Sequence, residues 1–217
     1  MAITTYDELK ASIANWLNRD DLTAVIPDFI ALAEAQIARD VRHWRQEKRV
    51  TTSVNEQYEN LPIDWLEMIQ IQLTAGGRLQ VISADLLQDR KEASLTPHKP
   101  KYYRLTSDQI EFYPAPDSSY EVAMQYYARV PALSDAETSN WILTDYPDIY
   151  LYGCLKHASV FLMEDERVPL FEVSYLKALA DLEEANEKAK YSDGSLIKRV
   201  RTYGHKARTK TYYASNT

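Results

Sequence analysis

Apolar residues recur at helical spacing near the N-terminus of the chain. The sequence TYDE at 5–8 is a capping box, in which a threonine hydroxyl and a glutamate carboxylate satisfy the first backbone groups of a helix. The apolar stripe that follows consists of Leu9, Ile13, Trp16 and Leu17. Beyond Pro27, which fits the first turn of a helix, a second stripe consists of Ile30, Ala33, Ile37, Val41 and Trp44. The pattern predicts an N-terminal helical hairpin over 5–45.

The same spacing returns in the last third of the chain. The stripe that follows Pro147 consists of Leu151, Leu155, Ala158 and Leu162. A second stripe beside it consists of Tyr150, Cys154 and Phe161. Two stripes predict that this helix is buried on more than one side. After a turn at 164–169, a final helix is indicated by Phe171, Tyr175, Ala178, Leu179 and Leu182. Lys188 and Lys190 suit the negative end of that helix, and the pair of helices forms a hairpin over 146–191.

Between the two hairpins, the apolar period changes from helical to alternating. Segments with strand-like patterns are RVTTSV at 49–54, MIQIQLT at 68–74, RLQVIS at 78–83 and YEVAMQYYARV at 120–130. The turn AGG at 75–77 predicts a β-hairpin over 68–83, and KYYRLTSDQIEFYP at 101–114 predicts a second one. ADLLQDRKEA at 84–93 predicts a short helix between them.

This order of elements predicts an α+β fold that is mainly α. We expect the N- and C-terminal helical hairpins to build a four-helix bundle, with a small antiparallel β domain inserted between them and an extended arm at the C-terminus. The expected parts are a helical bundle over 1–46 and 140–194, a β domain over 47–139 and a C-terminal arm over 195–217.

Composition and charge single out the C-terminal segment. The 217 residues suffice for one sizeable domain, and their hydrophobic share of 45% is normal for a globular protein. The sequence contains no run of about 18 apolar residues, so it predicts no transmembrane helix. The sequence MAITTYDELK lacks the features of a secretory signal. Residues 195–217 hold six Lys and Arg and no acid. The other residues therefore hold 19 basic and 32 acidic side chains, a net charge of −13.

Searches for catalytic or metal-binding patterns in the sequence are negative. No P-loop, GxSxG or HExxH sequence is present. The single cysteine, Cys154, lies in an apolar helical stretch, and the four histidines share no metal-ligand spacing. The carboxylates at 164–166 fit a turn, and those of Glu183 and Glu184 fit a solvated helix face. The sequence therefore predicts no enzyme, no cofactor and no metal site.

The basic and aromatic segment KRVRTYGHKARTKTYYASNT at 198–217 leaves three interpretations open. It fits a solvated end without fixed structure, an arm that folds onto another protein, or an arm that binds nucleic acid. The acidic charge of the remaining chain weighs against the last of these, because it repels phosphates. The candidate docking residues are Lys198, Arg199, Arg201, Tyr203, Lys206, Arg208, Lys210, Tyr212 and Tyr213.

Most of the chain resembles the head-to-tail adaptor proteins of tailed phages, also called connector or head-completion proteins. The resemblance is carried by the opening helices at 5–44 and by NWILTDYPDIYLYGCLKHASVFLMEDERVPLFEVSYLKALADLEEAN at 140–186. The β portion contributes LPIDWLEMIQIQL at 61–73 and PKYYRLTSDQIEFYPAPDSSYEVAMQYYARVPALSD at 100–135. The likeness reaches about residue 190 and contains no catalytic motif.

The resemblance implies a structural virion protein that is assembled in the host cytoplasm and lies in the neck of the particle. Copies would form a homo-oligomeric ring, usually of twelve, beneath the portal protein. The ring would extend the DNA channel, close the packaged head and carry tail and nozzle proteins, with DNA passing through without specific binding and no membrane involved. Because the C-terminal segment of such adaptors commonly packs against the portal, we expect residues 195–217 to dock there. The alternative is a nucleic-acid-binding accessory protein that uses its basic tail.

Overall fold

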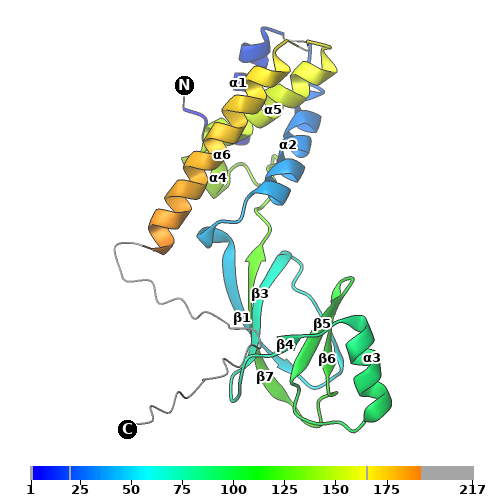
Figure 1. Ribbon diagram of the computed structural model, residues 1–217. Helices are drawn as coiled ribbons and strands as arrows, with labels where there is room; N and C mark the ends of the chain where they lie inside the picture. Colours follow the sequence, from blue (N-terminus) through cyan, green and yellow to red (C-terminus); the bar gives the residue numbers. More distant parts are fainter. Residues whose placement is uncertain (1, 20, 165, 192–217) are drawn as a thin grey trace, which may run out of the picture.

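The computed structural model describes residues 2–19, 21–164 and 166–191. Figure 1 shows most of the helices gathered at one end of the molecule and two β-sheets at the other. The first end, here called the helical half, consists of α1 (Tyr6–Leu17), α2 (Ile26–Asp40), α4 (Trp141–Asp145), α5 (Pro147–Phe161) and α6 (Val168–Lys190). The second end, here called the sheet half, contains the strands and α3 (Ala84–Ala93).

Helix α1 begins where the capping box predicts. The Oγ1 atom of Thr5 accepts a hydrogen bond from the backbone nitrogen of Glu8 at 3.3 Å, and Oε2 of Glu8 accepts one from the backbone nitrogen of Thr5 at 3.0 Å. The helix ends at Asn18, whose φ of 50° is the left-handed conformation common at helix ends. Helix α2 has Pro27 in its first turn. Both predicted N-terminal helices are therefore confirmed.

Helix α5 is the central helix of the helical half. It packs against α1, α2, α4 and α6, and its buried residues are Ile149, Tyr150, Leu151, Gly153, Cys154, Leu155, Ala158 and Ser159. The predicted burial on more than one side is confirmed. A Cβ atom on Gly153 would lie 3.3 Å from Cβ of Ala33 in α2 and 3.5 Å from the ring of Tyr175 in α6. Glycine at this position thus lets both neighbouring helices approach α5 at one level.

The sheet half contains two sheets that share a core. The first sheet has the order β1–β7–β3, is antiparallel throughout, and consists of β1 (Glu47–Val54), β7 (Tyr120–Ala128) and β3 (Trp65–Leu73). The second has the order β2–β6–β5–β4 and consists of β2 (Tyr58–Asn60), β6 (Gln109–Tyr113), β5 (Tyr102–Thr106) and β4 (Gln80–Val81). The core between the sheets includes Ile71, Ile110, Phe112, Val122 and Tyr126.

The expected fold class is wrong. Among the residues that the structure describes, the chain is an α+β protein with six α-helices and seven strands in two sheets. It is not a helical bundle with a small inserted antiparallel domain, because the sheet half has hydrophobic cores of its own and includes α3. One strand pair is parallel, since β4 runs alongside β5 in the same direction. The division into domains at 1–46, 47–139 and 140–194 stays a prediction.

The two predicted β-hairpins have different outcomes. Strands β5 and β6 pair antiparallel in continuous register, which confirms the hairpin over 101–114. The hairpin over 68–83 is wrong, because β3 meets the returning chain through one isolated bridge between Gln72 and Arg78 and β4 then joins the other sheet. An alternating pattern shows that a segment is extended, but it does not identify the strand with which the segment pairs.

A buried polar cluster fixes the chain where it returns from β7 to the helices. Asn140 caps α4, since its Oδ1 atom accepts a hydrogen bond from the backbone nitrogen of Leu143 at 2.9 Å. Its Nδ2 atom donates to the carbonyl of Pro131 at 2.9 Å and to the hydroxyl of Tyr150 at 2.7 Å. The Tyr150 hydroxyl in turn donates to Glu34 at 3.4 Å. The cluster therefore joins α2, α4, α5 and the loop before α4.

Candidate functional site

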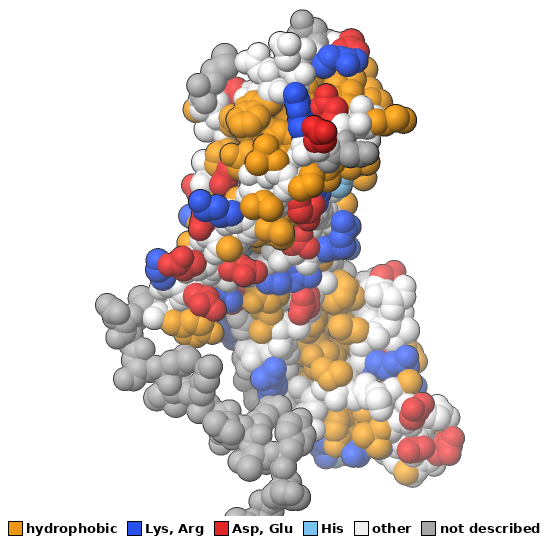
Figure 2. Space-filling model, turned by 45° about the horizontal axis from the view of Figure 1, so that its top comes forward, with side chains coloured by type: hydrophobic (Ala, Val, Ile, Leu, Met, Phe, Trp, Pro, Cys, Tyr) orange, Lys and Arg blue, Asp and Glu red, His pale blue; other side chains and the backbone are white. Residues whose placement is uncertain are grey.

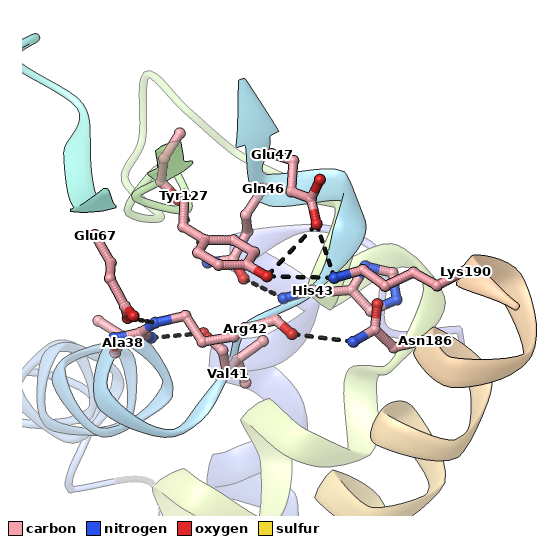
Figure 3. Close-up of polar contacts among 11 residues, drawn as sticks. Ala38, Val41, Arg42, His43, Gln46, Glu47, Glu67, Tyr127, Asn186 and Lys190 are labelled. Atoms are coloured by element: carbon pink, nitrogen blue, oxygen red, sulfur yellow. Dashed lines mark hydrogen bonds and ion pairs between the residues drawn. The ribbon is translucent and has the colours of Figure 1, made fainter. Parts of the chain in front are cut away.

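The predicted docking residues of the tail, Lys198 to Tyr213, lie outside the described residues. The structure instead locates the point from which the tail departs, because α6 ends at Lys190 and Tyr191 is the last residue described. Figure 3 shows this end of α6 beside the chain that crosses from α2 to β1. We call the contact region between the two halves, including residues 38–47 and the end of α6, the junction.

Lys190 fixes the last turn of α6 to the first sheet. Its Nζ atom lies 2.7 Å from Oε1 of Glu47 and donates a hydrogen bond to the hydroxyl of Tyr127 at 3.2 Å. Glu47 begins β1, and Tyr127 is its register partner near the end of β7. One lysine therefore holds α6 to two adjacent strands.

One turn earlier, Asn186 holds the chain that crosses between the two halves. Its Oδ1 atom accepts a hydrogen bond from the backbone nitrogen of Trp44 at 3.0 Å, and its Nδ2 atom donates to the carbonyl of Arg42 at 3.1 Å. An amide side chain has both an acceptor and donors, so it can satisfy two backbone groups at once. Asn186 thereby fixes α6 against this crossing.

Arg42 links the end of α2 to the first sheet. Its Nε atom lies 2.7 Å from Oε2 of Glu67 in β3. Its Nη1 atom donates to the carbonyls of Ala38 at 2.9 Å and Val41 at 2.7 Å. Carbonyls at the end of a helix lack partners within the helix, so the guanidinium both caps α2 and connects it to β3.

Buried polar side chains complete the junction. The backbone nitrogen of His43 donates to Oε1 of Gln46 at 2.8 Å, and Nε2 of Gln46 donates to the carbonyl of Ala128 in β7 at 3.3 Å. The His43 ring stacks on Trp141 of α4, with 4.7 Å between the ring centroids. Because His43 and Gln46 are both buried, each of these bonds removes the cost of an unsatisfied polar group.

The electrostatics of the junction favour a charged lysine and a neutral histidine. Burial acts to lower the pKa of Lys190, but the hydrogen bonds to Glu47 and Tyr127 outweigh it and the pKa is raised. The pKa of His43 is lowered, first by burial and then by the positive charges of Arg45 and Lys190. This arrangement suits the positioning of chain segments rather than the transfer of a proton.

An open depression of about 550 Å³ lies beside the junction. Of its charged side chains, Lys48 pairs with Asp64 and Arg45 with Asp145. The third cation, Arg129, donates a hydrogen bond to the carbonyl of Trp65 at 3.2 Å. The hydrogen bond from Lys48 is the main reason that the pKa of Asp64 is lowered. A carboxylate that is paired and more acidic than usual is a poor general acid or base near neutral pH, so the depression offers a shaped surface rather than reactive groups.

The other candidate chemistry in the chain is structural. Burial raises the pKa of Glu34, but its carboxylate accepts hydrogen bonds inside the buried polar cluster. Cys154 is fully buried, which raises the pKa of its thiol. Among the described residues, no group of three or more His, Cys, Asp or Glu side chains is placed to hold a metal ion. That same part of the chain has no helix whose length and apolar character would let it cross a membrane.

No local pattern in the sequence predicts the junction. Lys190 is predicted only as a charge that suits a helix end, and no pattern gives Asn186 a role. Trp44 and Asn186 are 142 positions apart, so no local pattern relates them. The available signal was the polar type of Asn186, which lies on the side of α6 next to the buried stripe and is only half-buried.

Comparisons with known proteins identify the family of the chain. No curated protein matches it. A family model described as SU10 adaptor protein matches residues 4–201. The matched range includes the helical half, the sheet half and the tail as far as Arg201, past the end of α6 at Lys190. The chain therefore belongs to the SU10 adaptor protein family, a family of structural head-to-tail adaptors of phages.

Proposed function

We propose that copies of the chain form a ring beneath the portal of the phage head and that residues 195–217 dock each copy onto the portal protein. The family supplies the coarser statement: the chain is a structural phage adaptor, and its place is the neck of the virion. In the proposed assembly the ring, of the twelve copies usual for such adaptors, extends the DNA channel, closes the packaged head and offers the platform to which tail proteins attach.

The observation that supports docking by the tail is its fixed point of departure. Asn186 and Lys190 hold the last two turns of α6 to the junction, so the segment after Tyr191 starts at the same place in every copy. A fixed start raises the effective concentration of the segment near a partner that binds the same copy. The segment carries six positive charges and three tyrosines. Among these residue types, Arg and Tyr are favoured at protein interfaces.

The charge of the remaining chain supports the proposed passage of DNA. Residues 1–194 carry a net charge of −13. A surface with the same sign as the phosphates does not gain affinity by releasing counterions from DNA. DNA would therefore move past the adaptor without a specific contact.

Two truncations test the docking proposal. Removal of residues 195–217 should leave the circular dichroism spectrum and the melting temperature unchanged but abolish capture of the chain by immobilised portal protein. Removal of residues 202–217 alone deletes only the part of the tail that lies beyond the family match. We expect this shorter truncation to weaken portal capture without abolishing it. Full portal capture by the shorter chain would refute the docking role.

A charge variant provides a matched control for the truncations. Replacement of Arg199, Arg201 and Arg208 by Gln should weaken portal capture. Replacement of the exposed Lys177 and Lys188 of α6 by Gln should leave it unchanged, although it also removes positive charge. Equal losses in both variants would show that overall charge, and not the tail, sets the affinity.

The alternative function is nucleic-acid binding by the tail, which is favoured by its six cations and interleaved tyrosines. Displacement of counterions by six cations gives a slope of log affinity against log salt of up to about −5. A slope of this size for double-stranded DNA, lost when residues 195–217 are removed, would support the alternative. A chain that binds portal but not DNA at about 0.15 M salt would exclude it.

A further inference from the structure

Helix α6 has two apolar faces on opposite sides. One is buried, largely against α5, and comprises Phe171, Tyr175, Ala178 and Leu182. The other is exposed and comprises Pro169, Val173, Leu176 and Ala180. Steps of four, three and four residues keep the second set on one line along the helix. Val173 is 66% exposed and Leu176 is 54% exposed. A surface helix needs one apolar face, so the fold of a single copy does not explain the outer one.

Acidic residues continue the same line toward the junction. Glu183, Glu184 and Glu187 are exposed and follow Ala180 at helical spacing. Glu184 pairs with Lys188, whereas Glu183 and Glu187 form no ion pair within the described part of the chain. Figure 2 shows hydrophobic side chains over the upper part of the helical half and more charged side chains below them. We call the exposed line from Pro169 to Glu187 the outer face of α6.

Helix α2 has an exposed apolar face with a basic residue at its junction end, and the exposed Asp28 lies on the same line one turn before Ala31. Ala31, Leu32 and Ala35 are exposed, Leu32 to 51%. Arg39 follows one turn later, and it too is exposed without an ion pair among the residues described. Alanines on either side of one leucine allow another helix to approach closely. We call the set from Ala31 to Arg39 the outer face of α2.

Helices α2 and α6 run in the same direction, so each position along one helix can be matched to a position along the other. Gly153 of α5 adjoins both Ala33 of α2 and Tyr175 of α6, which are 142 positions apart. Nearer the junction, Asn186 bonds to Arg42, and these two are 144 positions apart. The Tyr175 hydroxyl also donates to Asp40 at 3.1 Å, and these two are 135 positions apart. A residue of α2 is therefore level with a residue of α6 that lies about 135 to 144 positions later.

This offset brings the apolar part of one outer face opposite the apolar part of the other, and the basic end of one opposite the acidic end of the other. Leu32 is level with residues 167–176, which include the exposed Val173 and Leu176. Arg39 is level with residues 174–183, a range that ends at the unpaired Glu183. If two copies stand side by side at one height, the leucine of one meets the apolar line of the other, and the arginine meets the acidic line.

We propose that the outer face of α6 in one copy packs against the outer face of α2 in the next copy, as the repeating contact of the ring. This inference rests on the proposed function and names the surfaces that build it. The contact is heterologous, since it joins two different faces, and contacts of this kind generate closed rings when the rotation between copies permits.

A second copy of the chain explains both faces with one contact. Within one copy α2 and α6 both pack on α5, so each turns its outer face away from the helix between them. An unrelated partner on α6 would leave Arg39 and Leu32 of α2 without a role. A second copy supplies an apolar surface and a countercharge at the matching height for each face.

Engineered cysteines test the contact directly. A chain with Leu32→Cys and Val173→Cys, assembled on portal and oxidised, should give a ladder of disulfide-linked multimers on a non-reducing gel. The native Cys154 is 0% exposed and does not interfere. The control chain carries Ala11→Cys with Val173→Cys, since Ala11 is exposed on α1 outside both faces. It should remain monomeric on the gel.

A charge exchange tests the same contact without a covalent bond. Arg39→Glu should reduce the fraction of chain in rings by about tenfold, because it places like charges at each contact. Combining Arg39→Glu with Glu183→Arg should restore the rings, while circular dichroism shows that each variant is folded. Failure of the second change to restore them would overturn the proposed register.

The proposed α6–α2 contact and the proposed function are overturned by different results. Rings seen by electron microscopy on portal, without the disulfide ladder and unaffected by Arg39→Glu, would overturn the α6–α2 contact and leave the proposed function intact. No ring on portal under any condition would overturn both. A ladder from the control chain as strong as that from the test chain would also overturn the assignment of the faces.

Discussion

Replacement of Asn140 by Ala removes one side chain that serves three separate partners. Asn140 caps α4 by accepting from the backbone nitrogen of Leu143, and it donates to the carbonyl of Pro131 and to the hydroxyl of Tyr150. The residue is 8% exposed, so water cannot easily replace the lost bonds. The substitution also leaves a part-buried carbonyl and a buried hydroxyl with fewer partners.

The expected cost follows from these three bonds. Loss of an N-cap side chain costs about 1 kcal/mol. Each of the other two hydrogen bonds contributes roughly 1 kcal/mol net, with more when a buried polar group is left unsatisfied. The total loss in the free energy of unfolding is therefore about 2–4 kcal/mol. For a chain of 217 residues, this corresponds to a fall in melting temperature of about 5 to 15 °C.

Urea denaturation at low protein concentration measures this loss, with two variants for comparison. Asn140→Ser keeps an N-cap acceptor but lacks the amide donors, so its loss should lie between those of wild type and Asn140→Ala. Asn15→Ala changes the same residue type at an exposed position of α1 and should be close to neutral. If Asn140→Ala costs less than about 1 kcal/mol, or no more than Asn15→Ala, the cluster does not fix the returning chain to the helices as argued.

Three further predictions concern the junction and the central helix. Lys190→Met should lower the free energy of unfolding by about 1 kcal/mol and speed amide hydrogen exchange in the last turn of α6, whereas Lys188→Met should leave both nearly unchanged, since Lys188 bonds only within an exposed turn. Burial lowers the pKa of His43, so the unfolded chain, with a His pKa of about 6.5, takes up the proton first. Stability should therefore fall as the pH drops below about 6.5, and His43→Asn should reduce that fall when unfolding is measured from pH 7.5 to 5. Gly153→Leu should cost about 1–3 kcal/mol or more in thermal denaturation, because the side chain would meet Ala33 and Tyr175, while Gly153→Ala should cost much less.

The sequence predicts the helices of this chain well because their signals are local. The capping box at Thr5, Pro27 in the first turn of α2 and the double stripe of α5 each lie within a few residues of the structure they specify. The pairing of the strands is harder to predict from the sequence. The pattern over 78–83 shows an extended segment, but its partner is β5, about twenty residues away and reached through α3. Pairing over such a distance depends on packing between sheets, which has no local signature.

The candidate site also depends on contacts between distant segments, which local patterns in the sequence do not predict. Six positive charges mark the tail in the sequence, but nothing local shows that Asn186 and Lys190 fix the place where it begins. The outer face of α6 does have a local signal, since Pro169, Val173, Leu176 and Ala180 repeat at helical spacing. The stripe from Phe171 to Leu182 is by itself enough to predict an amphipathic helix, so this second line adds nothing to the prediction of α6. A second apolar line on one helix indicates a contact that the single chain does not complete.

The attachment of α6 at two points has a mechanical consequence. A free helix end frays one hydrogen bond at a time when its chain is pulled, so it yields at low force. Here a pull on the chain beyond Tyr191 is met by Lys190 on β1 and β7 and by Asn186 on the crossing at 42–44. Tension is thus divided between the first sheet and the crossing that joins the two halves before α6 can unwind. We expect the tail to transmit force to the whole subunit rather than to the last turn of one helix.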